Sequence, residues 1–341
     1  MVMNSEVLNT LYIQTQGVYL RLEGDTLRIE HEDVTLRNVP LHHLGGLALF
    51  GNVLVSPYLL HRCAQDGLEV TWFSESGRFQ GRLAGPVSGN VLLRQAQYRA
   101  LDNPSSSLYL AQRFVEGKLK NARLVLQRAV RERGETEALA LALYEHEAAL
   151  RQLPQARSLD EVRGLEGGAA SAYFAAFGDL LLSGEFRFDG RNKRPPRDPV
   201  NALLSFVYAL LTTQCTAALE GVGLDPQAGF LHALRPGRHA LALDLLEEFR
   251  AWWADRLALS LLNRKQLAPE HFEVRPGGAV LLNEEGRKAV IVAFQTRRLE
   301  TVQHPLFKEP VPVGLLPHIQ ARLLARYLRG DLPQYLPFVG R

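Results

Sequence analysis

The segment GFLHALRPGRHALALDLLEEFR, residues 229–250, holds a histidine and two acids at a spacing that could do chemistry. Asp244 and Glu247 are three residues apart in an expected helix, which puts them on one face with their Cβ atoms about 5–6 Å apart. His232 precedes that helix by a short Pro-Gly turn and could fold back beside either acid. Two like charges at this distance repel each other unless they are solvated, paired with bases or gathered around a cation. The segment therefore predicts either an exposed acidic turn or part of a metal site.

The first interpretation, an exposed acidic turn, agrees with the usual preferences of residues near a helix start. Acids in the first turn of a helix are favoured by the helix dipole. Arg235, Arg238 and Arg250 are close enough in sequence to pair with the two carboxylates. Taken alone, this helix favours the acidic turn over a metal site.

A third carboxylate strengthens the second interpretation. Glu166 lies in RGLEGGAASAYFAAF, inside an expected helix that also holds Gly164, Gly167 and Gly168. Because glycine in a helix interior costs about 0.5–1 kcal/mol relative to alanine, these residues indicate close approach of another backbone or of a ligand. One imidazole with two or three carboxylates and no thiolate suits Mg²⁺ or Mn²⁺ better than zinc. The residues alone leave the metal site and the acidic turn about equally supported.

Basic residues gather in three stretches that could follow a nucleic acid. The overall net charge of +3 is too small to imply nucleic acid by itself. Any single basic stretch is also typical of a solvated surface, but several of them beside an acidic metal site predict contacts to the phosphate backbone. The stretches comprise Arg113, Lys118, Lys120, Arg123, Arg128, Arg131 and Arg133 on a long helix, Arg191, Lys193, Arg194 and Arg197 in a loop, and Arg322, Arg326 and Arg329 near the C-terminus.

The elements that must position these residues divide the chain into a β-rich part and a helical part. Residues 1–87 alternate apolar and polar residues across turns at 24–25 and 32–33, as hairpin strands do. A helix that starts at Ser56 and stops before Gly67 is expected within this part. From residue 88 the period becomes helical, which predicts a linker helix at 88–104 and an all-α domain at 105–341. The fold class is therefore α+β, with a small β-domain followed by a larger all-α domain.

Size and composition exclude several classes of protein. A chain of 341 residues, 46% of them hydrophobic, is expected to form two domains. Its two cysteines provide neither a disulfide framework nor a zinc site. No apolar run approaches the roughly 20 residues that span a bilayer, and the N-terminus does not look like a secretory signal. We expect a protein of the cytoplasm that does not enter the membrane.

Three segments closely resemble the CRISPR-associated adaptation integrase and endonuclease family. They are RGLEGGAASAYF, NKRPPRDPVNALLSFVYALL and GFLHALRPGRHALALDLLEEFR, and the resemblance runs from end to end of the chain. GNVLLRQAQYRA and the C-terminal HPLFKEPVPVGLLPHIQARLLARYLRGDLPQYLPF look like the subtype I-C branch. The resemblance implies an N-terminal β-sandwich-like domain through which the protein forms a homodimer, and a C-terminal helical domain.

The resemblance also implies a set of site residues. The family's metal triad falls on Glu166, His232 and Glu247, with Mg²⁺ or Mn²⁺ as the metal, and Asp244 matches a neighbouring acid that also takes part in catalysis. Glutamate stands at the third ligand position where several relatives have aspartate, so the choice between Asp244 and Glu247 as the third ligand stays open. The expected DNA-binding residues are Arg235, Arg250, Arg163, Arg238, Lys118 and Arg123.

The implied activity is insertion of prespacer DNA into a CRISPR array during spacer acquisition in antiviral defence. A DNA 3′-hydroxyl attacks a phosphodiester at the leader–repeat boundary, and because bond energy is conserved no ATP site is needed. The implied partners are double-stranded DNA and the small second adaptation protein, in the prokaryotic cytoplasm. Two alternatives stay open: a metal-dependent nuclease of branched or single-stranded DNA in repair, and a non-catalytic scaffold for DNA ends.

Overall fold

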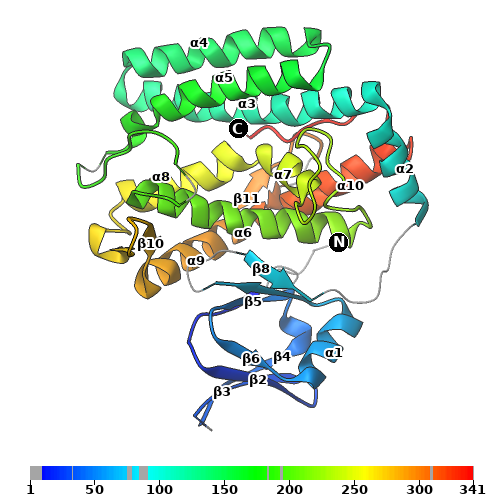
Figure 1. Cartoon of the computed structure of the whole chain (residues 1–341), viewed down its shortest axis with the longest axis vertical. Helices are drawn as coiled ribbons and strands as arrows, with labels where there is room; N and C mark the ends of the chain where they lie inside the picture. The colour runs from blue at the N-terminus through cyan, green and yellow to red at the C-terminus, as the bar shows by residue number, and fades with distance from the viewer. Residues whose placement is uncertain are drawn as a thin grey trace.

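The N-terminal strands form a small unit against one side of a larger helical body (Figure 1). This computed structural model describes residues 10–32, 34–74, 79–83, 91–182, 184–192, 195–307 and 310–340. Strands come first and helices follow, so the expected α+β fold class is confirmed. The expected boundary between the two parts, at residues 87–88, lies outside the described residues.

Two four-stranded sheets make up the N-terminal unit. One has the order β4-β3-β2-β6 and the other β1-β5-β7-β8. The turn expected at 24–25 joins β2 to β3, with Gly24 at a φ of 59°. The strands are β1 Thr10–Ile13, β2 Val18–Glu23, β3 Thr26–His31, β4 Val34–Pro40, β5 Gly46–Phe50, β6 Val53–Val55, β7 Glu69–Phe73 and β8 Phe79–Arg82.

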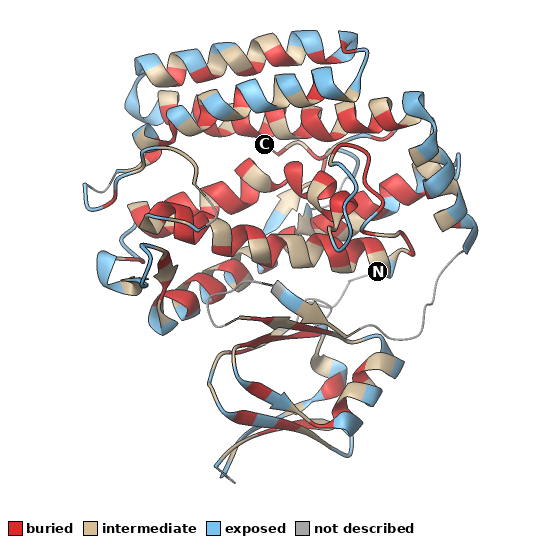
Figure 2. Cartoon of the chain, in the orientation of Figure 1, coloured by how far each residue is buried: buried red, intermediate tan, exposed pale blue. Residues whose placement is uncertain are grey.

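Strand β5 is buried on both faces and joins the two parts of the protein (Figure 2). Leu47 and Leu49 pack into the core between the two sheets, whereas Ala48 and Phe50 belong to the core of the helical body. The ring centroid of Phe50 lies 4.8 Å from that of Phe73 and 6.1 Å from that of Phe206 on helix α6, Pro199–Gly221. A strand covered on both faces needs a continuous apolar run, and GLALF provides one.

The helix expected after Ser56 is α1, Pro57–Asp66. The Ser56 side chain accepts a hydrogen bond from the Leu59 backbone N–H, and Gly67 ends the helix in the left-handed region at φ 69°. Both signals act as the sequence predicts, because a serine cap satisfies a free N–H and glycine tolerates a positive φ.

The helical body is built around α6, which runs through its middle (Figure 1). Of the described helices, α6 alone is long and apolar enough to cross a bilayer by length and composition, and most of that stretch is buried inside the protein, as in a core helix. Asp198 caps α6 by accepting a hydrogen bond from the Asn201 N–H. The helices are α2 Val91–Asp102, α3 Pro104–Arg133, α4 Glu137–Gln152, α5 Leu159–Ala175, α6 Pro199–Gly221, α7 Ala240–Glu247, α8 Arg256–Asn263, α9 Glu284–Leu299 and α10 Leu316–Leu328.

The structure departs from the expected helices in three places. Serines at 105–107 would be ordinary caps for α3, but the helix is capped by Asn103, whose carboxamide oxygen accepts from the N–H groups of two of them. The apolar period of residues 240–262 predicts one continuous helix, but a π-helical turn at Arg250–Asp255 splits it. Helix α9 and two short hairpins in the helical part were not predicted from the sequence. Their strands are β9 Phe272–Val274, β10 Val280–Leu282, β11 Thr301–Gln303 and β12 Pro310–Pro312.

Candidate active site

Helices α3, α5 and α7 each bring one charged side chain to the same point. Lys118 of α3 forms an ion pair with Glu166 of α5 and lies with its Nζ 2.8 Å from Oε2 of Glu247 on α7. His232, in the loop before α7, places its Nε2 3.9 Å from Oε1 of Glu247. The three residues expected to hold a metal therefore gather in space, and the Lys118 ammonium lies between the two carboxylates.

Asp244 organises the histidine loop. Its Oδ2 accepts hydrogen bonds from the N–H groups of Phe230 and Leu231, at 2.6 and 3.0 Å. Its Oδ1 lies 2.9 Å from the backbone nitrogen of His232 and 2.7 Å from the ring Nδ1. Because Asp244 is fully buried and both oxygens are engaged, it acts on the site through His232. A proton on Nδ1 leaves the lone pair of Nε2 free to face Glu247.

A glycine lets this loop pack against α7. A Cβ atom at Gly229 would lie 2.5 Å from the backbone carbon of Ala240, so only glycine fits without a shift. The loop is also tied to α5, because Nε of Arg163 donates to the Leu231 carbonyl at 2.9 Å. The position of His232 is thus fixed from both helices that carry the acids.

Glu247 is a buried carboxylate held in its charged form. Burial by itself would raise the pKa of Glu247, but the positive charges of Arg250 and Lys118 outweigh that effect and lower this pKa to about 2. Nη2 of Arg250 lies 2.8 Å from Oε1 of Glu247, and its guanidinium carbon is 4.7 Å from the centroid of the Tyr208 ring. Glu247 is therefore ionised throughout the physiological pH range.

The donor atoms fit a divalent cation. Two carboxylates and one imidazole form the set that hard and borderline cations such as Mg²⁺ and Mn²⁺ accept. Oε2 of Glu247 is buried and accepts no hydrogen bond with proper geometry from the described part of the chain, although the Lys118 ammonium is close. Among the described residues no three acids, histidines or cysteines are near enough to hold a metal in this conformation. A positive charge, that of Lys118, occupies the space between the acids.

The glycine-rich face of α5 is open. Gly164, Gly167 and Gly168 are exposed, and a Cβ at any of them would meet nothing within 4 Å. The expectation that another backbone of this chain packs there is wrong. The other expectation, close approach of a ligand to the surface beside Glu166, stays a prediction.

The expected DNA-binding residues are spread over different surroundings. Arg250 and Lys118 pair with the acids of the site, and Arg163 holds the histidine loop. Arg235 is exposed in that loop, with Arg238 half-buried beside it. Arg123 instead faces α4, where its Nη2 lies 3.5 Å from Oε1 of Glu147. Of the basic loop, Lys193 and Arg194 lie outside the described residues.

Two roles could not be predicted from the sequence. Lys118 was expected to contact DNA, and no local signal indicated that it would lie between Glu166 and Glu247. The anchoring of Asp244 by three consecutive backbone N–H groups was also missed. The distance of twelve residues between His232 and Asp244 gives no sign of such a contact, since a loop must fold back to make it.

Known proteins resemble this chain in sequence. Residues 11–296 match the family described as CRISPR associated protein Cas1. The chain is 49% identical over 339 residues to CRISPR-associated endonuclease Cas1 1 of Chlorobaculum tepidum, covering 98% of this chain and 99% of the relative. It is 48% identical over 340 residues to the protein of the same description from Moorella thermoacetica, again covering 98% and 99% of the two chains.

Solved structures share the fold at low sequence identity. A casposase bound to integration product superposes with a TM-score of 0.84 at 22% identity, covering 96% of this chain and 92% of the other. A Cas6-RT-Cas1–Cas2 complex gives a TM-score of 0.83 at 22% identity, covering 97% of this chain and 36% of the other. With the sequence matches, which extend over nearly the whole length, they lead to one conclusion: the chain belongs to the Cas1 family of CRISPR-associated proteins.

Proposed function

We propose that the protein is a divalent-metal-dependent DNA integrase and endonuclease of CRISPR adaptation, of the subtype I-C kind. It would insert prespacer DNA into the CRISPR array by attack of a DNA 3′-hydroxyl on a phosphodiester. The observation that carries this proposal is that Glu166 and Glu247 both contact the Lys118 ammonium, while Nε2 of His232 lies 3.9 Å from Oε1 of Glu247. Two carboxylates that already hold one positive charge, with an imidazole beside one of them, are the donor set that a divalent cation would use.

Each residue of the site has a role in this chemistry. Glu166 and Glu247 offer carboxylate oxygens, and the latter stays charged because its pKa is about 2. Asp244 fixes the ring of His232 so that Nε2 faces the acids. Bound among these three, Mg²⁺ or Mn²⁺ would neutralise a non-bridging oxygen of the scissile phosphate and make the attacking hydroxyl more acidic. Arg250 keeps Glu247 in place and charged.

The partners of this reaction follow from the same proposal. The substrate would be double-stranded DNA, both prespacer and leader–repeat, contacted by Arg235 and Arg238 beside the site and by Arg123 farther along α3. A fold shared with a casposase bound to integration product supports DNA as partner, and one shared with a Cas1–Cas2 complex supports the small second adaptation protein. The protein would act as a homodimer in the cytoplasm, where the array lies.

A strand-transfer assay tests the proposal. A labelled prespacer duplex and a supercoiled plasmid carrying a leader and repeat are incubated with the protein and its Cas2 partner, with Mg²⁺, Mn²⁺ or excess EDTA. We expect label joined covalently to the plasmid with either metal and none with EDTA. Glu166→Ala should bind DNA and lose joining.

Other outcomes would select the alternatives. Products that are only nicked or shortened would indicate a repair nuclease that uses water in place of the 3′-hydroxyl. A Glu166→Ala variant that keeps every function would indicate a scaffold for DNA ends. Joining that continues in excess EDTA would refute a metal-dependent mechanism.

A further inference from the structure

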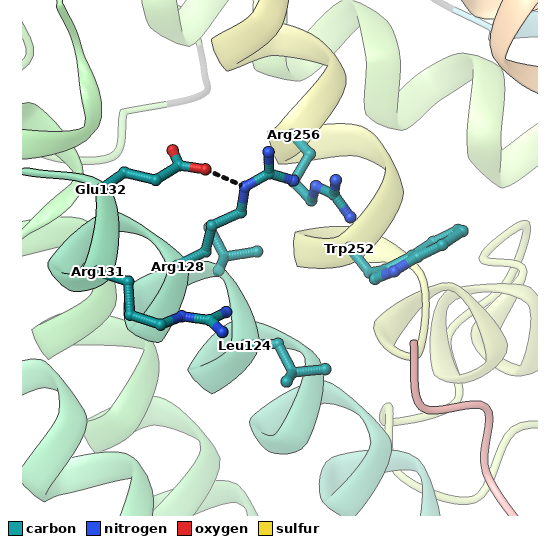
Figure 3. A pocket seen from close by; sticks show the side chains of 7 residues that line it. Leu124, Arg128, Arg131, Glu132, Trp252 and Arg256 are labelled. Carbon is teal, nitrogen blue, oxygen red and sulfur yellow. Dashed lines mark hydrogen bonds and ion pairs between the residues drawn. The ribbon is translucent and has the colours of Figure 1, made fainter. Parts of the chain in front are cut away.

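A pocket of about 390 Å³ lies between the C-terminal half of α3 and the chain around the start of α8. Figure 3 shows Arg128, Arg131 and Glu132 entering it from α3, and Trp252 and Arg256 from the opposite ribbon. Its volume falls within the range of about 300–1,000 Å³ that is usual for ligand sites. None of its residues belongs to the candidate active site.

The pocket carries more positive charge than its own acid can neutralise. Nε of Arg128 donates to Oε1 of Glu132 at 2.6 Å, which accounts for one arginine and the one lining acid. Arg131 and Arg256 form no hydrogen bond or ion pair with any residue that the structure describes. Within the described part of the chain, these two guanidinium groups therefore face the same space without a hydrogen-bonded counter-ion.

The Arg256 guanidinium is held in this position by an aromatic ring. Its central carbon lies 5.9 Å from the centroid of the Trp252 ring, and that of Arg297 lies 4.8 Å from the same ring. Burial lowers the pKa of Arg256 below the ordinary arginine value, and the charges of Arg297 and Arg128 lower it further than those of Glu300 and Glu132 raise it. Positive charge that is half-buried and repelled by its neighbours is stabilised by an incoming anion.

We propose that this pocket binds successive backbone phosphates of nucleic acid, at a site separate from the candidate active site. Each guanidinium presents a planar fork of N–H donors that matches two oxygens of one phosphate. Nucleic acid supplies one negative charge per nucleotide, so two adjacent phosphates match Arg131 and Arg256, whereas a single carboxylate would leave one charge unneutralised. Because Trp252 is buried beneath the arginines, bases do not stack on it and binding is independent of sequence.

The position of the pocket suits a role in holding DNA at a distance from the reacting phosphate. Lys118 and Arg131 are 13 positions apart on α3, which corresponds to about 20 Å along a helix. That length equals about six base pairs of duplex at 3.4 Å each. The inference rests on the proposed function in taking DNA as the substrate, and it adds an anchoring point that the chemistry itself does not use.

The salt dependence of DNA binding tests the inference. A fluorescein-labelled duplex is titrated with the full-length protein in EDTA, across a series of salt concentrations, and affinity is read from anisotropy. On duplex DNA the slope of log K against log salt changes by about 0.9 per neutralised phosphate, so Arg131→Gln with Arg256→Gln should reduce it by about 1.8. Arg131→Lys with Arg256→Lys should keep most of the slope. The matched control is Arg99→Gln with Arg151→Gln, two exposed arginines on other helices.

The possible results separate this inference from the proposed function. A double glutamine variant that is folded by circular dichroism and keeps the wild-type slope overturns the pocket alone. The control variant losing as much slope as the pocket variant also overturns it, because the effect would then be one of net charge. A decaglutamate peptide that binds wild type but not the pocket variant, with DNA binding unchanged, would assign the pocket to an acidic protein segment and overturn the inference. Wild type that binds no DNA would overturn both proposals.

Discussion

Replacing Lys118 with methionine tests whether the Lys118 ammonium occupies the position that a metal ion would take. The Lys118 ammonium contacts both Glu166 and Glu247, and its side chain is 12% exposed. A cation that enters between the two carboxylates must displace the ammonium first. Methionine keeps a similar length and apolar stem but has no charge, so the variant should bind divalent metal more tightly than wild type.

The size of the effect follows from the contacts that metal entry breaks. A hydrogen bond to a charged group contributes about 1.5–3 kcal/mol. Each 1.4 kcal/mol corresponds to about a tenfold change in a binding constant. Loss of one of the two contacts therefore predicts at least about tenfold tighter binding of Mn²⁺, and loss of both predicts at least about 100-fold. Glu247 remains ionised in the variant because Arg250 still lies 2.8 Å away.

Calorimetric titration of Mn²⁺ into the metal-free protein, without DNA, measures this directly. The matched control is Lys120→Met, because Lys120 lies two residues along α3 and pairs with Glu116 outside the site. We expect the control to bind Mn²⁺ as wild type does. Equal or weaker binding by the Lys118→Met variant would refute the reasoning, since it would mean that the ammonium and the metal do not compete.

Three further predictions concern the surroundings of the site. Asp244→Asn removes acceptors from the backbone N–H groups that Asp244 holds and from the ring of His232, so Mn²⁺ affinity measured by calorimetry should fall about 10- to 100-fold. Gly229→Ala places a Cβ 2.5 Å from the backbone of Ala240, so denaturant unfolding should show a loss of about 1–3 kcal/mol. Burial raises the pKa of the Glu248 carboxyl to about 8, so the folded state favours its neutral form. The free energy of unfolding should therefore fall as pH rises from about 4.5 to 8. Glu248→Gln should remove this part of the pH dependence, as measured by thermal unfolding.

Opposite results would be informative in each case. Unchanged Mn²⁺ affinity after Asp244→Asn would mean that His232 does not need its carboxylate partner. A Gly229→Ala variant with the same free energy of unfolding as wild type would mean that the loop can move away from α7. Parallel pH profiles for wild type and Glu248→Gln would mean that the pKa of this carboxyl is the same in the folded and the unfolded protein.

The sequence predicted those parts of the fold that depend on local signals. Ser56 caps α1 as expected, and Asp198 caps α6 in the same way, because a cap needs only a side-chain oxygen and the N–H groups that follow it. The π-helical turn at Arg250–Asp255 was not predictable in this way. The apolar residues there continue a helical period across it, and packing rather than pattern determines the change.

The site was predicted in its members but not in their arrangement. Glu166, His232 and Glu247 do gather, and their role as metal ligands stays a prediction. The place of Lys118 depends on how α3 is rotated against α5 and α7, which only tertiary packing sets. Asp244 and Glu247 share one face of a helix, and only the folded loop around His232 distinguishes an anchored acid from one that faces the cation space.

The burial of β5 on both faces connects the N-terminal sheet to the candidate catalytic carboxylate, Glu247. Phe50 of this strand touches Phe206, Tyr208 follows two residues later on α6, and its ring lies against the guanidinium of Arg250. That guanidinium in turn forms an ion pair with Glu247. A continuous series of side-chain contacts thus links the N-terminal sheet to the carboxylate. If two copies join through their sheets, this series would connect the surface between the copies with each candidate active site.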